Sequence, residues 1–142
     1  MKKLLILLAT IQLCSTTQFS VSTNFTCNLG GSRKVQLGIW ESDFAGVKDN
    51  KIGVDDLDFK AFGTSSVEGQ TSKDHPSDEK EFFIYAWIYH NCTPSGESEC
   101  LYNYLGSSNP SLEKVEYKFS ANLSNSTLQK CSYYPNLLSR YS

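Results

Sequence analysis

The sequence predicts an all-β domain, and three observations support that prediction. Hydrophobic residues alternate with polar ones in several segments, which is the pattern of strands with one buried face. Stretches rich in glycine, asparagine, aspartate and proline separate these segments. Beyond the N-terminal leader, no helical hydrophobic pattern persists for three turns. The remaining length is that of one domain with a core of its own.

The alternation places the strands in order along the chain. A first strand is expected around Phe25 and Cys27, which share one face, and residues 28–31 follow it as a turn. Strands with one buried face are then expected over residues 33–40, 57–62 and 114–122. Further turns are expected at residues 48–53 and 71–80.

Residues 81–92, EFFIYAWIYHNC, form a different kind of strand because both of its faces are apolar or aromatic. Such a strand is covered on both sides, by the core on one side and by another layer on the other. The face formed by Phe83, Tyr85, Trp87 and Tyr89 is a candidate binding face. The alternative is that loops and glycans of the same domain cover it.

The N-terminus has the order of a secretory signal peptide. Lys2 and Lys3 precede an apolar run over residues 4–13, which is too short to span a bilayer of about 30 Å. Residues 1–20 are therefore expected to be removed, with cleavage between 15 and 22, to leave one exported domain over 21–142. No later segment is apolar enough for a membrane span. Removal of the two lysines changes the formal charge from −2 to −4, which disfavours nucleic acid as a partner.

Export also changes how the cysteines and asparagines are interpreted. Four cysteines remain, and an even number in an oxidising compartment predicts two disulfides with three possible pairings. Three sequon asparagines lie opposite the buried face of their strands, which predicts exposed amides. The cysteines are Cys27, Cys92, Cys100 and Cys131, and the N-glycosylation sequons begin at Asn24, Asn91, Asn122 and Asn125.

His90 lies within eleven residues of Cys92 and Cys100, so a zinc site, a thiol nucleophile and a disulfide are all conceivable. The exported setting favours the disulfide, because a nucleophile or ligand needs a free thiolate. His90 alternates in phase with Cys92, so it is expected at the core edge, bonded to a backbone group or a tyrosine.

The aspartates Asp49, Asp55, Asp56 and Asp58 do not follow the calcium-loop order and are expected in water. Neither a metal nor a cofactor is expected.

Four segments, in order, resemble the nematode transthyretin-like family, secreted proteins with a prealbumin-type β-sandwich. They are NFTCN (24–28), KVQLGIWESD (34–43), DDLDFKAFGTS (55–65) and FFIYAWIYHNC (82–92). The resemblance implies an antiparallel sandwich of seven or eight strands, an extracellular setting and no cofactor. Some members have only the two cysteines that correspond to Cys27 and Cys92, so the resemblance also implies a Cys27–Cys92 disulfide. The two remaining cysteines would then form a Cys100–Cys131 disulfide. A Cys92–Cys100 bond is disfavoured because residues 93–99 have the composition of a turn.

The function that follows from the resemblance is binding without catalysis, as a carrier or adaptor. The expected partner is an extracellular protein or a small apolar ligand, and a homodimer is an open alternative. The competing interpretation is a hydrolase related to the hydroxyisourate hydrolases of the same fold. Those enzymes need an early histidine and a C-terminal Tyr-Arg-Gly-Ser, whereas the first histidine here is His75 and the chain ends SRYS. The hydrolase would bring His75, His90 and Arg140 together in a pocket.

Overall fold

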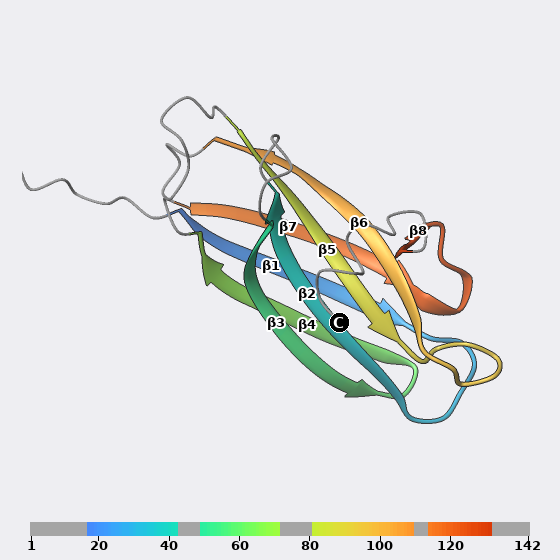
Figure 1. Cartoon of the computed structure of the whole chain (residues 1–142). Coiled ribbons are helices and arrows are strands. Elements are labelled where there is room, and N and C mark those ends of the chain that lie inside the picture. Colours follow the sequence, from blue (N-terminus) through green and yellow to red (C-terminus); the bar gives the residue numbers. More distant parts are fainter. Residues whose placement is uncertain (1–16, 43–48, 72–80, 110–113, 132–142) are drawn as a thin grey trace, which may run out of the picture.

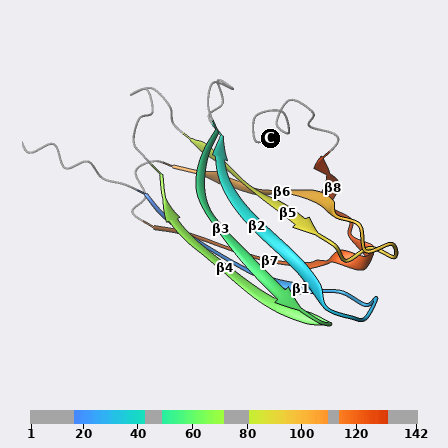
Figure 2. The same ribbon diagram turned by 60° about the horizontal axis from the view of Figure 1, so that its bottom comes forward.

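The computed structural model describes residues 17–42, 49–71, 81–109 and 114–131. In these ranges two β-sheets pack face to face, which confirms the predicted all-β sandwich (Figures 1 and 2). One sheet has the strand order β4-β1-β7 and the other has the order β3-β2-β5-β6-β8. The strands are β1 (Gln18–Thr26), β2 (Arg33–Ser42), β3 (Asp49–Phe59), β4 (Phe62–Gln70), β5 (Phe82–His90), β6 (Glu99–Ser108), β7 (Lys114–Asn122) and β8 (Gln129–Lys130), with a 3₁₀ turn η1 (Leu123–Asn125) after β7.

One strand pair departs from the expected antiparallel arrangement. Strands β1 and β7 pair in parallel, whereas the other pairs among the described strands are antiparallel. Antiparallel neighbours are commonly joined by a hairpin, as β5 and β6 are here. Strand β7 instead enters its sheet by crossing over from β6 in the other sheet, so no hairpin sets its direction.

The core lies between the inner faces of the two sheets. On β2 the inward residues are Val35, Leu37 and Ile39, as the alternation predicted, and each is buried. Within the three-stranded sheet, the ring of the buried Phe25 on β1 meets the partly buried ring of Phe119 on β7 edge to face, with centroids 6.4 Å apart. The other fully buried apolar side chains of the core include Phe19, Val21, Ile84, Ile88 and Leu101.

Two disulfides staple the sandwich, and their pairing confirms the one that the resemblance implied. Cys27 follows β1 and Cys92 follows β5, so their bond ties one sheet to the other with a Cα–Cα distance of 6.0 Å. Cys100 on β6 bonds Cys131, which follows β8, with a Cα–Cα distance of 5.4 Å. These four sulfurs are therefore neither thiol nucleophiles nor zinc ligands.

Two expected segments were wrong. The strand predicted over residues 57–62 is two strands, because β3 ends at Phe59 and β4 begins at Phe62 in the other sheet. Only Lys60 and Ala61 link them, and both are exposed. Ala61 continues the apolar alternation by chance, so the corner between sheets leaves no trace in the pattern. The turn predicted over residues 48–53 also fails, because β3 already begins at Asp49.

Strands β3 and β4 close one edge of the sandwich by unusually close backbone approach. A Cβ on Gly53 would lie 2.6 Å from Val67 Cγ1 and 3.1 Å from the Glu68 carbonyl oxygen. A Cβ on Gly69 would overlap the Ile52 carbonyl oxygen. Neither position has a positive φ, so glycine is needed here for space and not for its backbone freedom.

Strand β1 begins closer to the N-terminus than the sequence indicated. Gln18 is its first residue, and the side chains of Phe19 and Val21 are buried in the core. A leader that ended at residue 20 would remove three residues of β1, the buried Phe19 among them. Within the expected window of 15–22, only cleavage before Thr17, which is itself buried, leaves the strand and its N-terminal contact whole.

Candidate functional site

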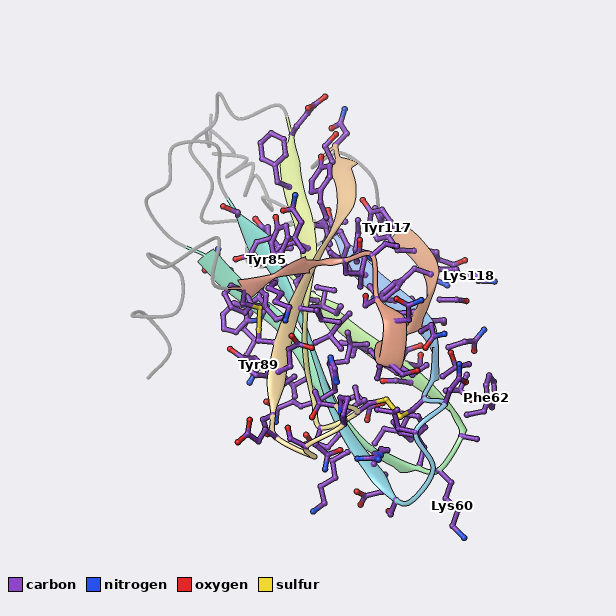
Figure 3. All side chains as sticks on the ribbon, turned by 90° about the vertical axis from the view of Figure 1, so that its right-hand side faces the viewer. Lys60, Phe62, Tyr85, Tyr89, Tyr117 and Lys118 are labelled. Carbon is purple, nitrogen blue, oxygen red and sulfur yellow. A yellow bond between two sulfur atoms is a disulfide. The ribbon has the colours of Figure 1, made fainter. Side chains whose placement is uncertain are left out.

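The two outer faces of the sandwich differ in chemistry. The outer face of the three-stranded sheet is polar, with exposed residues such as Asn24, Thr64 and Lys118. The outer face of the five-stranded sheet has aromatic side chains from β2, β5 and β6. Figure 3 shows Tyr85 and Tyr89 on one side of the sandwich and Phe62 and Lys118 on the opposite side. A sheet face that keeps large rings toward the outside is the natural place to look for binding.

The four rings of β5 differ in exposure. Tyr85 and Trp87 are buried, at 3% and 2% exposed, and Phe83 is half-buried. Tyr89 is 37% exposed and stacks on Trp87, with ring centroids 6.3 Å apart and an interplanar angle of 20°. Tyr102 on β6 packs against both buried rings. The predicted face is therefore partly covered, and Tyr89 is the ring of the four that it offers most openly to water.

A first surface depression, here named the aromatic hollow, lies on the β2, β3 and β5 side of Tyr89. Its volume is about 490 Å³, which is the size of small-molecule sites. Gly38 leaves its floor open, because a Cβ there would lie 3.0 Å from Trp40 Nε1 and 3.8 Å from Val54 Cγ2. The lining residues are Gln36, Gly38, Trp40, Lys51, Val54, Trp87 and Tyr89.

A second depression, here named the sequon hollow, lies on the other side of Tyr89 and has a volume of about 470 Å³. Part of its wall is polar, because Gln36 Nε2 donates to Asp56 Oδ1 at 2.9 Å and the exposed Asp58 also lines it. Tyr89 and Gln36 belong to both hollows and divide one from the other. The lining residues are Lys34, Val35, Gln36, Asp56, Leu57, Asp58, Tyr89, His90, Asn91 and Ser98.

His90 closes the inner end of the sequon hollow and is 2% exposed. Its Nδ1 accepts the backbone N–H of Cys92 at 3.2 Å, which confirms the expected bond to a backbone group. Nε2 lies 3.9 Å from Glu99 Oε2, too far for a hydrogen bond. Burial lowers the pKa of His90, and it outweighs the opposing charge of Glu99. The imidazole is thus held neutral, with its proton on Nε2.

The protonation of His90 makes stability depend on pH. The folded-state pKa of His90 is below the unfolded value of about 6.5, so between these two pKa values the unfolded chain binds more protons than the folded protein. The contribution of the neutral His90 to the free energy of unfolding is fully present above about pH 6.5, and it is lost as the pH falls through the folded-state pKa. Protonation of Nδ1 also removes the acceptor for Cys92. Glu99 on β6 and Lys130 on β8 are the charged groups that act on it.

We therefore expect the urea midpoint to fall on acidification from about pH 8 to about pH 5, and to fall less in His90→Asn. Asparagine keeps an oxygen acceptor near the position of Nδ1 but does not titrate. Urea titrations at several pH values measure both slopes. Equal slopes in the two proteins would show that His90 contributes nothing.

Two aspartates of β3, Asp55 and Asp56, make hydrogen bonds to neighbouring strands. Asp55 Oδ2 accepts from Ser65 Oγ at 2.5 Å and from the Ser66 N–H at 3.3 Å, which ties β3 to β4. Asp58 is exposed to water, as expected. Within the described ranges, no three His, Cys, Asp or Glu side chains are grouped to hold a metal ion.

The four sequon asparagines lie at the surface in different settings. Asn24, Asn122 and Asn125 are exposed, and Asn122 Oδ1 caps η1 by accepting from the Ser124 N–H at 3.2 Å. Asn91 is half-buried in the sequon hollow. The predicted outward direction holds for Asn24 and Asn122, whereas Asn91 is only partly accessible.

The hydrolase alternative gains no support from these contacts. His90 is buried and its Nδ1 is occupied, which does not suit a solvent-facing base. The other two groups that the alternative needs, His75 and Arg140, lie outside the described residues.

Comparison of the chain with protein-family models, with characterised proteins and with solved structures finds no significant match. In the part of the chain that the structure describes, no helix has the length and apolar character needed to cross a membrane. The site is therefore interpreted from its own residues, and what these define is an all-β, disulfide-stapled sandwich with an aromatic hollow on one outer face.

Proposed function

We propose that the protein is an extracellular binding protein, a carrier or adaptor of the transthyretin-like family, and that the aromatic hollow takes a small apolar ligand. The hollow is the observation that supports this proposal. Trp40, Val54, Trp87 and Tyr89 supply apolar walls, while Gln36 and Lys51 supply a few polar groups at its border. A concave site with apolar walls and few polar groups is typical of small-ligand binding.

The rest of the molecule is consistent with this role. The described residues form seven long strands and one short strand, which is consistent with the seven or eight that the resemblance implies. Two disulfides suit an oxidising compartment. They also hold the five-stranded sheet rigidly, because one bond fixes β5 to β1 and the other fixes β6 to the residue after β8. A rigid, preformed site loses little free energy to ordering when a ligand binds.

The chain carries its own reporter of binding. It has two tryptophans, Trp40 and Trp87, and both line the aromatic hollow. The probe N-phenyl-1-naphthylamine is neutral and apolar and accepts energy from tryptophan. We expect it to bind with quenching of the tryptophan emission. The variant Val54→Lys should weaken this binding at least about tenfold, because a ligand must then desolvate an ammonium group.

The matched control is Thr64→Lys, which places the same charge on an exposed position of the opposite sheet. It should bind the probe as the unchanged protein does. Both positions are exposed on strands, so both variants are expected to fold. Equal weakening in the two variants, or no saturable quenching in any of them, would remove the aromatic hollow as the binding site.

A further inference from the structure

The sequon hollow contains a feature that the binding proposal does not use. Asn91, the asparagine of the sequon Asn91-Cys92-Thr93, lines this hollow together with the exposed ring of Tyr89. Tyr89 and Asn91 are two positions apart in extended chain, so their side chains point to the same side of the sheet. A glycosylation site and an open aromatic ring thus share one depression.

The contacts of Asn91 leave the reactive atom available. Its backbone N–H donates to the Lys34 carbonyl at 3.3 Å, and its Oδ1 accepts the Lys34 N–H at 2.8 Å. Its carbonyl accepts from Arg33 Nη1 at 3.0 Å. Nδ2 is the atom that carries an N-linked sugar, and it makes no hydrogen bond within the described residues. The side chain is therefore anchored through its oxygen, and its nitrogen is left for the sugar.

The walls of the hollow have the chemistry of a sugar site. A sugar ring presents polarised C–H groups on one face, and these are attracted to the negative face of an aromatic ring. Tyr89 is a firm platform because it stacks on the buried Trp87. Sugar hydroxyls donate to carboxylates, and Asp56 and Asp58 supply them beside Gln36.

We infer that an N-linked glycan on Asn91 folds back onto the protein, with its first sugars packed on Tyr89 in the sequon hollow. The inference rests on the extracellular setting in the proposed function, since only an exported chain acquires such a glycan. A glycan in this position leaves the aromatic hollow open. It also packs against Tyr89, the residue that separates the two hollows. The sugar is then a structural part of the domain as well as a surface modification.

The test is a double-mutant cycle on the full chain secreted from a eukaryotic host that adds N-linked glycans. Its members are the unchanged protein, Tyr89→Ala, Asn91→Asp and the double variant. Aspartate at 91 keeps the Oδ1 acceptor for Lys34 and loses the sugar, but it also adds a negative charge near Asp56 and Asp58, which the unglycosylated protein controls for. We expect mass spectrometry to find Asn91 occupied. Asn91→Asp should lower the melting temperature by about 3 °C when Tyr89 is present and by much less in Tyr89→Ala.

Two controls separate the sugar from other causes. The same cycle with the protein refolded from bacteria, which lacks glycans, should show no coupling between positions 89 and 91. Asn24→Asp, on the polar face of the opposite sheet, should give the same shift with and without Tyr89. An unoccupied Asn91, or equal coupling in the glycosylated and bacterial proteins, would overturn the inference. The binding proposal is tested separately, because the refolded protein still reports probe binding through Trp40 and Trp87.

Discussion

Alanine at Gly69 is expected to destabilise the protein by about 3 kcal/mol or more, because it overpacks a site where backbone meets backbone. The added Cβ would overlap the Ile52 carbonyl oxygen and would lie 2.7 Å from Ile52 Cγ2. The Ile52 side chain could rotate away, but its carbonyl is part of β3 and can move only if the strand moves. The edge at which β3 crosses β4 would therefore open, and core burial around Val67 would be lost with it.

Urea unfolding with both disulfides intact measures this loss, and Gly30→Ala is the matched control. Gly30 has a φ of 67° and nothing within 4 Å of the position of a Cβ, so alanine there has backbone strain without a steric clash. That strain should cost about 1–2 kcal/mol. If Gly69→Ala were no more destabilising than Gly30→Ala, the close approach of β3 and β4 would not be real.

Alternation identified the strands that have one water-facing side. Strand β7 has the predicted bounds, and β2 was recognised nearly whole from its alternation. Strand β5 was recognised nearly whole for another reason, because its run of apolar and aromatic residues is continuous and five of them in succession are buried. Alternation missed β4, in which the inward positions include Gly63, Ser65 and Gly69. Small and polar residues occupy that inner face because β3 lies so close to it. A hydrophobic pattern cannot signal a strand whose buried face has no room for hydrophobic side chains.

Part of the candidate site was also visible in the sequence, and part was not. Tyr89 and Trp87 were identified by their place on β5, and the Cys92 sequon drew attention to Asn91. Gly38 and Trp40 were overlooked, although they stand at outward positions of β2 where polar residues are expected. That break in the alternation was the available signal. The β3 side of the hollow, with Val54, could not be foreseen, because pairing of β2 with β3 depends on a bulge at Ile39–Trp40.

Removal of the Cys27–Cys92 bond is expected to be the other large effect. The double variant Cys27→Ala/Cys92→Ala releases a loop with a sequence separation of 65 residues. The chain-entropy model gives about 4 kcal/mol for such a loop, which is a large share of the stability of an ordinary domain. Both cysteines are also only 1% exposed, so alanine leaves unfilled space in the core between the two sheets.

The second disulfide provides the comparison that separates these two causes. Cys100→Ala/Cys131→Ala releases a loop with a separation of 31, and loop entropy alone would make it only about 0.7 kcal/mol less costly than the first. Cys100 and Cys131 pack in the smaller cluster with Tyr85 and Trp87, away from the main core. Urea unfolding should therefore show that the two variants differ in free energy of unfolding by clearly more than the amount that loop entropy alone gives. A difference of only about 0.7 kcal/mol would mean that the Cys27–Cys92 bond acts only on the unfolded chain and that the core tolerates its absence.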